Sequence, residues 1–151
     1  HGGFPLIMRN FNTERLAMAA TAIGSSRRCL ADAVAWARER RTFGRRLADH
    51  QVIRHKLMDM YRQIAAAQAW LEQVAGRLRA GLPVAADIAL LKVQASLLME
   101  FCAREASQIL GGASYIRGTA IERIYREVRV VAIGGGSEEI LKDLAARQTG
   151  V

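Results

Sequence analysis

Apolar side chains recur along most of this chain at the three- and four-residue spacing of an α-helix. The clearest run starts near residue 53 and alternates steps of four and three, as in the seam of a coiled coil. Its members are Ile53, Leu57, Met60, Ile64, Ala67, Leu71, Val74 and Leu78. Gly81 and Pro83 end the pattern, and Asp49 is a candidate N-terminal cap. A long helix with one buried face is therefore predicted.

Two further long helices are predicted on the same grounds. The first begins near Asn12 or Thr13, since both can cap a helix, and lasts to about Arg41, before the break at 42–44. Its apolar positions are Leu16, Ala20, Ile23, Leu30, Val34 and Ala37. The other ends at 111–112, and its apolar positions are Ile88, Leu91, Ala95, Leu98, Cys102, Ala106 and Ile109. The seam that begins near residue 53 and the set from Ile88 to Ile109 are interpreted as core.

The C-terminal third predicts two shorter helices. Thr119 and Glu122 have the spacing of a capping box for a helix that carries Ile121, Ile124 and Val128. A last helix is expected from Ser137 to about residue 148.

Long helices with short links pack best as an antiparallel, left-handed bundle. No strand pattern longer than four residues is found. The predicted fold is therefore all-α, an antiparallel four-helix bundle of long helices with a short C-terminal helix. Residues 13–151 are assigned to this bundle domain, and residues 1–12 are expected to be an irregular lead-in from a preceding part of the protein.

Composition supports helices and limits the chemistry. Hydrophobic residues make up 51% of the chain and aromatic residues only 6%, which favours helix over sheet. No run approaches the roughly 18 apolar residues of a membrane span, and no signal-peptide pattern is found. Cys29 and Cys102 lie singly on apolar helical faces and are interpreted as buried, inert thiols. The three histidines show no ligand spacing, so no metal site is predicted.

The formal net charge is +8, and part of it is concentrated in one short stretch. The stretch contains Arg38, Arg40, Arg41, Arg45 and Arg46. Such a cluster is as consistent with one phosphorylated cofactor as with a nucleic-acid backbone, and an exposed, solvated basic face is the third reading. Because no aromatic platform and no nucleic-acid motif accompany it, no nucleic-acid partner is predicted.

Three consecutive glycines precede the last helix. Each glycine at 134–136 costs about 1 kcal/mol inside a helix relative to alanine, so the chain turns there. Ser137 is a good N-cap, and Glu138 and Glu139 complement the helix dipole. The segment is either a flexible hinge or a ligand site, since a bare backbone beside a helix start attracts phosphate or a developing anion.

Five segments together resemble a known family. They are Thr13-Glu14-Arg15-Leu16, Arg40-Arg41-Thr42-Phe43-Gly44, His50-Gln51, Gln108-Ile109-Leu110-Gly111-Gly112 and Ile133 to Ile140. In order and spacing they resemble the C-terminal domain of the acyl-CoA dehydrogenase family, across nearly all 151 residues. That family has an N-terminal helical domain, a middle β-domain and this bundle, so the resemblance implies a fragment that is inactive alone.

The resemblance implies FAD as the cofactor. In the family, the segment like Arg40 to Phe43 reaches across a dimer interface to the FAD of the neighbouring subunit, with the arginine at its pyrophosphate. His50 and Gln51 correspond to the adenosine side, and the glycine turn after Gln108 to the phosphates. The implied cofactor-binding residues are Arg40, Arg41, Thr42, Phe43, His50, Gln51, Gln108, Gly111, Gly112, Ser137 and Glu139. One departure from the family pattern is the segment Ala113-Ser114-Tyr115, where the family usually has a second glycine before the aromatic residue.

The resemblance also locates a catalytic base. Many members carry a glutamate at the position of Gly135, which has no side chain to accept a proton. A subgroup, the long-chain and isovaleryl-type enzymes, places the glutamate on the first long helix, and the matching residue is Glu14. We therefore expect Glu14 to be the base in the same pocket as the glycine turn, with a mere helix-dipole role as the alternative.

The implied reaction is α,β-dehydrogenation of an acyl-CoA thioester. Glu14 removes the pro-R α-proton, the β-hydrogen leaves as hydride to the flavin, and a trans-2-enoyl-CoA forms. The Gly135 N–H and a flavin hydroxyl stabilise the carbonyl oxygen, and Arg15 and Gly136 are the implied substrate-binding residues. Missing bulk at residues 134 and 135 predicts room for branched or extended acyl groups.

The expected partners are an electron-transfer flavoprotein or another acceptor, and further copies of the chain in a homodimer or homotetramer. Location in a bacterial cytoplasm is expected, with the mitochondrial matrix as the alternative. A flavin-dependent acyl-CoA oxidase or monooxygenase relative is one competing function. A stand-alone helical interaction module that uses its arginine face is the other.

Overall fold

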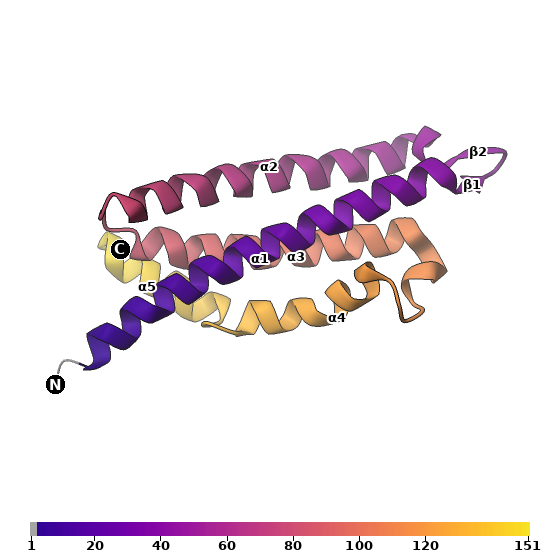
Figure 1. The fold of residues 1–151 in the computed structure, drawn as a ribbon. Helices are drawn as coiled ribbons and strands as arrows, with labels where there is room; N and C mark the ends of the chain where they lie inside the picture. The colour runs from indigo at the N-terminus through magenta and orange to yellow at the C-terminus, as the bar shows by residue number, and fades with distance from the viewer. Residues whose placement is uncertain (1–2) are drawn as a thin grey trace.

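The computed structural model describes the backbone of residues 3–151 and the side chains of residues 10–151. Its helices are α1 (Gly3–Glu39), α2 (Gln51–Arg79), α3 (Ala85–Leu110), α4 (Ala120–Ile133) and α5 (Glu138–Thr149). The short elements are β1 (Arg41–Thr42), β2 (Arg45–Arg46) and the 3-10 turns η1 (Leu47–Asp49) and η2 (Gly111–Ser114). Figure 1 shows α1, α2 and α3 side by side, each antiparallel to the helix before it in sequence, and α4 and α5 following each other back along α3. The predicted all-α antiparallel bundle is confirmed.

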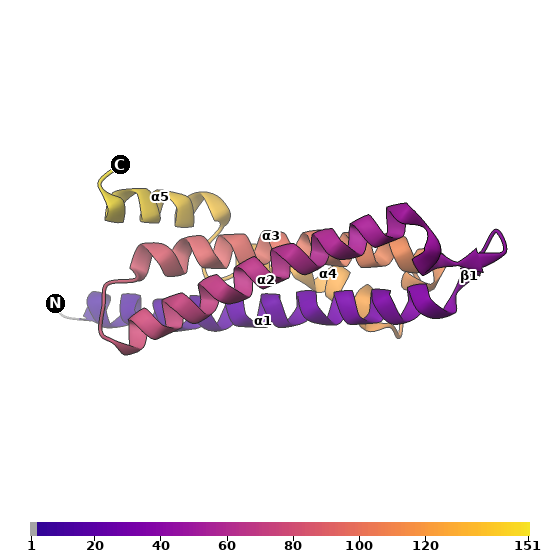
Figure 2. The same cartoon turned by 90° about the horizontal axis from the view of Figure 1, so that it is seen from above.

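Helix α3 is the central element of the bundle. It contacts α1, α2, α4 and α5, and Figure 2 shows α5 on the side of α3 away from α1. Every apolar position predicted for this helix is buried: Ile88, Leu91, Ala95, Leu98, Cys102, Ala106 and Ile109. On α2 the predicted seam is half-buried at Ile53 and Leu71 and buried at the other five positions from Leu57 to Val74, whereas Leu78 is 40% exposed in the last turn. The assignment of Leu78 to the core is wrong, because residues 78–79 at the end of α2 are exposed.

The predicted apolar side of α1 faces the bundle: Ile23 and Ala37 are buried, and Leu16, Leu30 and Val34 pack against the core. Ala20 is exposed, and the face against the bundle is lined by small side chains. They are Ala19, Ala22, Ser26, Cys29, Ala33 and Ala37, all without exposed surface. Small residues let α1 pack closely on α3, the helix with which it makes its most extensive contact. The apolar stripe therefore predicted the buried side of α1, except at Ala20, and did not identify most of the small residues that also line it.

The predicted start of the first helix is also wrong. Helix α1 begins at Gly3 and continues through Asn12 and Thr13. Pro5 falls in the first turn, where its missing N–H costs no helical hydrogen bond. The capping preference of Asn12 amounts to about 1 kcal/mol, too little to end a helix whose next turns pack on the bundle. The expected irregular lead-in is therefore helical from residue 3, and residues 1–2 lie outside the described residues.

The break after α1 is more ordered than the predicted basic loop. Residues 41–46 form a two-stranded antiparallel hairpin in which Arg41 pairs with Arg46. Phe43 and Gly44 both have positive φ, +52° and +79°, as in the tight turns that join such strands. Asp49 does not cap α2, because His50 is the N-cap. The Asp49 carboxylate instead accepts hydrogen bonds from the backbone N–H and guanidinium of Arg46.

The two cysteines provide a test of the packing. Cys29 and Cys102 have no exposed surface, and burial raises the pKa of each thiol to about 12. Because the thiolate is the reactive form, neither side chain should react with an aromatic disulfide reagent at pH 8 in the folded protein. Both should react after unfolding in guanidinium chloride. Fast reaction of one thiol in the native state would contradict this packing of α1 on α3.

Candidate functional site

The structure divides the predicted site residues into two clusters. In an up-and-down bundle the first and third helices end at the same end, so the chain after α1 meets the chain after α3. This end carries the hairpin and the Gly111 turn, and we call it the hairpin end. The second cluster is the triple glycine at 134–136, which we call the glycine turn. It lies between the end of α4 and the start of α5, and it contacts α1 at Arg15 and Met18.

A concave surface at the hairpin end brings together Arg40 and Gly111. It has a volume of about 470 Å³, and its lining includes Trp36, Thr42 and Gly112. The backbone of Arg40 is fixed by two hydrogen bonds: its N–H donates to the carbonyl of Trp36, and its carbonyl accepts from the N–H of Leu47. Its guanidinium has no hydrogen-bond partner in the described part of the chain. The residues expected at the cofactor phosphates thus share one surface.

The hairpin projects from this end of the bundle (Figure 1). Phe43 is 96% exposed at its tip, and its ring meets that of His50 edge-on at a centroid distance of 6.5 Å. The Thr42 hydroxyl lies 3.2 Å from His50 Nε2. Arg41, Gln51 and Gln108 are exposed. An apolar ring held at a positive φ in solvent is typical of a segment that another molecule covers.

The turn after α3 is closed by the residue that departs from the family pattern. Ser114 is buried, and its hydroxyl lies within hydrogen-bond distance of the Gly111 and Ser107 carbonyls, at 2.8 and 3.1 Å. The Ser107 hydroxyl is 2.7 Å away. Ser114 does not have a positive φ, so a second glycine is not required here. The serine locks the turn that presents Gly111 and Gly112.

The triple glycine at 134–136 is a packed turn. Gly135 and Gly136 have φ values of +69° and +115°, a region that favours glycine. A Cβ on Gly135 would lie 2.9 Å from the Met18 sulfur, and one on Gly136 would lie 3.1 Å from Leu141. Side chains from two helices thus enclose this segment, which argues against a freely flexible hinge.

Arg15 joins α1 to the glycine turn. Its Nε donates to the Gly135 carbonyl at 2.8 Å, and its guanidinium lies over the Phe11 ring at 5.5 Å. The residue is only 6% exposed, so it is buried and does not lie on the open surface of α1. Burial lowers the pKa of Arg15, and the charge of Glu14 opposes that shift. Its Nη1 is buried without a hydrogen-bond partner among the described residues, which leaves a donor beside the turn.

Glu14 lies on the same side of α1 as the turn. It precedes Met18 by one helical turn, and Met18 touches Gly134 and Gly135. Its side chain is exposed, and the carboxylate accepts a hydrogen bond from Asn10 Nδ2 at 2.6 Å. The start of α1 and the glycine turn therefore adjoin, and the role of Glu14 as base stays a prediction.

The start of α5 follows the glycine turn directly. Ser137 is the N-cap residue, but its hydroxyl accepts no hydrogen bond from the first turn. The pKa of the exposed Glu139 carboxyl is lowered chiefly by its own backbone N–H and then by the Ser137 hydroxyl. The predicted position of the cap is confirmed.

Sequence reasoning missed two residues at this turn, Met18 and Lys92. Met18 lies beside Gly134 and Gly135, and Lys92 Nζ donates to the Ala132 and Gly136 carbonyls. A signal for Lys92 was present, since it is the only charged residue in the apolar run from Ile88 to Val93.

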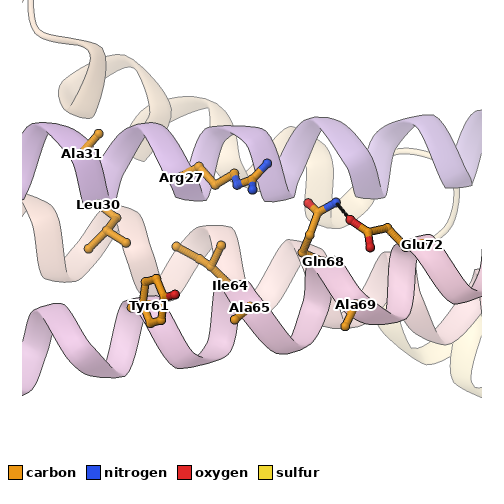
Figure 3. A pocket seen from close by; sticks show the side chains of 9 residues that line it. All are labelled: Arg27, Leu30, Ala31, Tyr61, Ile64, Ala65, Gln68, Ala69 and Glu72. Atoms are coloured by element: carbon orange, nitrogen blue, oxygen red, sulfur yellow. Dashed lines mark hydrogen bonds between the residues drawn. The ribbon is translucent and has the colours of Figure 1, made fainter.

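A second concavity, of about 430 Å³, lies between α1 and α2, away from both clusters. Figure 3 shows Leu30, Tyr61 and Ile64 there, with Gln68 donating to Glu72. It brings no catalytic pair together. Within residues 3–151, no helix has the length and apolarity needed to cross a membrane. The described side chains also form no group of three or more metal-binding residues.

The fold and the two clusters define a helical-bundle domain with a basic, glycine-lined surface at one end and a held glycine turn on its side. The sequence model of the family described as acyl-CoA dehydrogenase, C-terminal domain, matches residues 1–150. The chain belongs to the acyl-CoA dehydrogenase family, as its C-terminal domain.

Individual relatives agree with this assignment. An acyl-CoA dehydrogenase of Alternaria alternata is 38% identical over 158 residues, which cover 97% of this chain and 36% of that protein. The crystal structure of a probable acyl-CoA dehydrogenase from Mycobacterium abscessus superposes with a TM-score of 0.95 at 42% identity, covering 97% of this chain and 39% of its own. Butyryl-CoA dehydrogenase from Megasphaera elsdenii gives 0.95 at 32% identity, covering 99% and 39%. The chain thus spans less than two fifths of each relative.

Proposed function

We propose that this bundle is the C-terminal domain of a longer, FAD-dependent enzyme that converts an acyl-CoA thioester into a trans-2-enoyl-CoA. The observation that carries the proposal is the contact between α1 and the glycine turn, made by Arg15 and Met18. It brings the one-turn neighbour Glu14 to the side of the bundle where Gly135 lacks a carboxylate. The bundle domain includes the whole of α1 from Gly3, and other domains of the longer protein complete the site.

Glu14 acts as the general base. It removes the α-proton of the thioester, whose acidity the adjacent carbonyl raises, and the carboxylate becomes a carboxylic acid. Negative charge then develops on the thioester oxygen, and the Gly135 N–H donates to it. That N–H has no backbone acceptor among the described residues. Arg15 and Gly136 line the substrate beside this donor.

The hairpin end fits a phosphorylated cofactor. Arg40 offers a guanidinium without a protein partner, and a Cβ on Gly111 or Gly112 would meet nothing within 4 Å, so a ligand can approach the backbone. Bound FAD would supply the oxidant that accepts the β-hydrogen with its electron pair. Arg40, Thr42, Phe43 and Gly111 hold the cofactor of a neighbouring subunit. The other residues proposed for FAD are Arg41, His50, Gln51, Gln108 and Gly112 for that cofactor, and Ser137 and Glu139 beside the flavin of the same subunit.

The test is flavin reduction in the full-length protein by a panel of acyl-CoA thioesters, monitored anaerobically by the loss of flavin absorbance. Bleaching by at least one saturated thioester, with release of the 2-enoyl product, is expected. The missing side chains at residues 134 and 135 predicted room for longer or branched thioesters, but Met18 fills the space beside both glycines. A faster reaction with longer or branched thioesters than with butyryl-CoA would show that the room is provided elsewhere in the site. No bleaching with any thioester would contradict the dehydrogenase proposal. Stoichiometric oxygen consumption during turnover would identify the oxidase alternative and exclude an electron-transfer flavoprotein as the necessary acceptor.

Self-association is proposed as part of this function, since the FAD surface would serve a second subunit. Met58 and Tyr61 on α2 are 58% and 60% exposed, and Tyr61 lines the α1–α2 concavity of Figure 3. Replacing Tyr61 with glutamate should shift a homodimer or homotetramer toward smaller species in sedimentation, because it places a charge in an apolar contact. Glu72→Gln, at the rim, should leave the distribution unchanged. An unaltered oligomer in Tyr61→Glu would exclude this face.

A bacterial cytoplasmic or mitochondrial matrix location is proposed for the assembly.

A further inference from the structure

A fully buried lysine stands behind the glycine turn, and no step above uses it. Lys92 has no exposed surface, and its Nζ donates to the carbonyls of Ala132 and Gly136 at 2.9 and 2.8 Å. Burial lowers the pKa of Lys92, with the charge of Glu138 opposing the shift. Since an ammonium group is costly to remove from water, it persists here only with such acceptors.

Two cations from different helices hold consecutive carbonyls of the turn. Arg15 on α1 donates to the Gly135 carbonyl, and Lys92 on α3 donates to that of Gly136. The Gly136 N–H donates to Ile133 at 3.3 Å, so the peptide that follows Gly135 is fixed at both its polar atoms. The Gly135 N–H is left without a backbone acceptor among the described residues. The proposed oxyanion donor is therefore the polar group that this arrangement leaves available.

We propose that Lys92 is a positioning residue for the dehydrogenation: its ammonium fixes the turn at 134–136 so that the Gly135 N–H meets the thioester oxygen. This inference rests on the proposed function. Gly135 and Gly136 can adopt many other backbone conformations, and a misplaced donor at a reacting centre costs about 100-fold in rate. The buried positive charge also favours the negative charge that develops beside the turn.

A purely structural role makes a different prediction. Lys92 also neutralises the carbonyl end of α4 through Ala132, so its loss should lower stability in either case. Only the positioning role predicts a slower chemical step at nearly unchanged thioester affinity. Lys56 provides a matched control, because it is a half-buried lysine whose ion pair with the buried Glu105 lies on other turns of the bundle.

The experiment compares Lys92→Met with Lys56→Met in the full-length flavoprotein. Single-turnover flavin reduction gives the chemical rate, titration of the flavin spectrum gives the thioester Kd, and hydrogen exchange with mass spectrometry reports on residues 133–140. For Lys92→Met, reduction should slow about 10- to 100-fold while Kd changes less than about threefold, and amides of the turn should exchange faster. Lys56→Met should match the wild type in all three.

Reduction at the wild-type rate in folded Lys92→Met would overturn the proposal, even if its melting temperature falls. If Lys92→Met does not fold, Lys92→Gln replaces it, since it keeps a neutral donor. Failure of both to fold would assign Lys92 to folding and also overturn the proposal. If the wild type is bleached by no thioester, the proposed function fails and the catalytic part of the inference fails with it. Unchanged exchange in the turn would then overturn its structural part.

Discussion

Replacement of Glu14 by glutamine is expected to slow flavin reduction by acyl-CoA about 10²- to 10⁴-fold in the full-length enzyme, the range that a general base contributes. Glutamine keeps the shape of the side chain and its capacity to accept the hydrogen bond from Asn10. It cannot take the α-proton. Glu14 is exposed and makes no contact in the core, so the melting temperature should remain within the usual scatter of surface substitutions.

The comparison needs a carboxylate whose loss changes charge alone. Glu39 is suitable, since it is the last residue of the same helix, is exposed, and lies far along the helix from Glu14. Glu39→Gln should reduce its flavin at the wild-type rate. The thioester Kd should be similar in both variants, because the lost interaction belongs to the transition state. Wild-type reduction in Glu14→Gln would remove Glu14 from the base role and leave Gly135 without a replacement.

The same assignment limits what a carboxylate at residue 135 can restore. Gly135 has a positive φ, which costs a residue with a Cβ about 1 to 2 kcal/mol, and its Cβ would press on the Met18 sulfur. The packing of Met18 on α1 against the turn therefore requires a residue without a side chain at position 135. A base on α1 and a bare turn facing it form one consistent arrangement.

The buried faces marked by large apolar residues could be predicted from the sequence, and the buried small residues of α1 could not be told from its exposed ones. The seam of α3 is buried at every predicted position because leucine and isoleucine mark a face clearly. On α1, alanine occurs on both the buried and the exposed face, as Ala19 and Ala20 show. Hydrophobic periodicity cannot separate the two when the deciding property is size. The predicted first helix starts too late for a related reason. A capping residue begins a helix only where tertiary contacts allow the helix to begin, and α1 continues through Asn12 and Thr13.

The two clusters were predictable to different degrees. That residues after α1 and after α3 meet follows from the up-and-down topology, so Arg40 and Gly111 could be placed together once the bundle was predicted. The partners of the glycine turn could not be placed in this way, because they depend on where the α4–α5 segment lies along α1 and α3. Arg15 and Lys92, which are more than 70 residues apart in sequence, reach that turn from two different helices.

Replacing Arg40 with alanine should weaken FAD retention by the assembled enzyme. A charge-assisted hydrogen bond contributes about 1.5 to 3 kcal/mol, so the FAD Kd should rise about 10- to 150-fold. The alanine variant should keep its fold, because the guanidinium has no described partner and the carbonyl that accepts from Leu47 belongs to the backbone. Equilibrium dialysis of the full-length apoprotein against FAD measures the effect.

Arg38 is the matched control, because it is an exposed arginine two residues away in the last turn of α1. Arg38→Ala removes the same charge from the same basic stretch but not from the surface that includes Thr42 and Gly111. If general electrostatic attraction held the cofactor, both variants would lose FAD affinity equally. Added salt would then abolish this loss relative to the wild type. A selective loss in Arg40→Ala that persists at high salt is expected, since a fixed guanidinium beside a bare backbone recognises a pyrophosphate by geometry as well as charge.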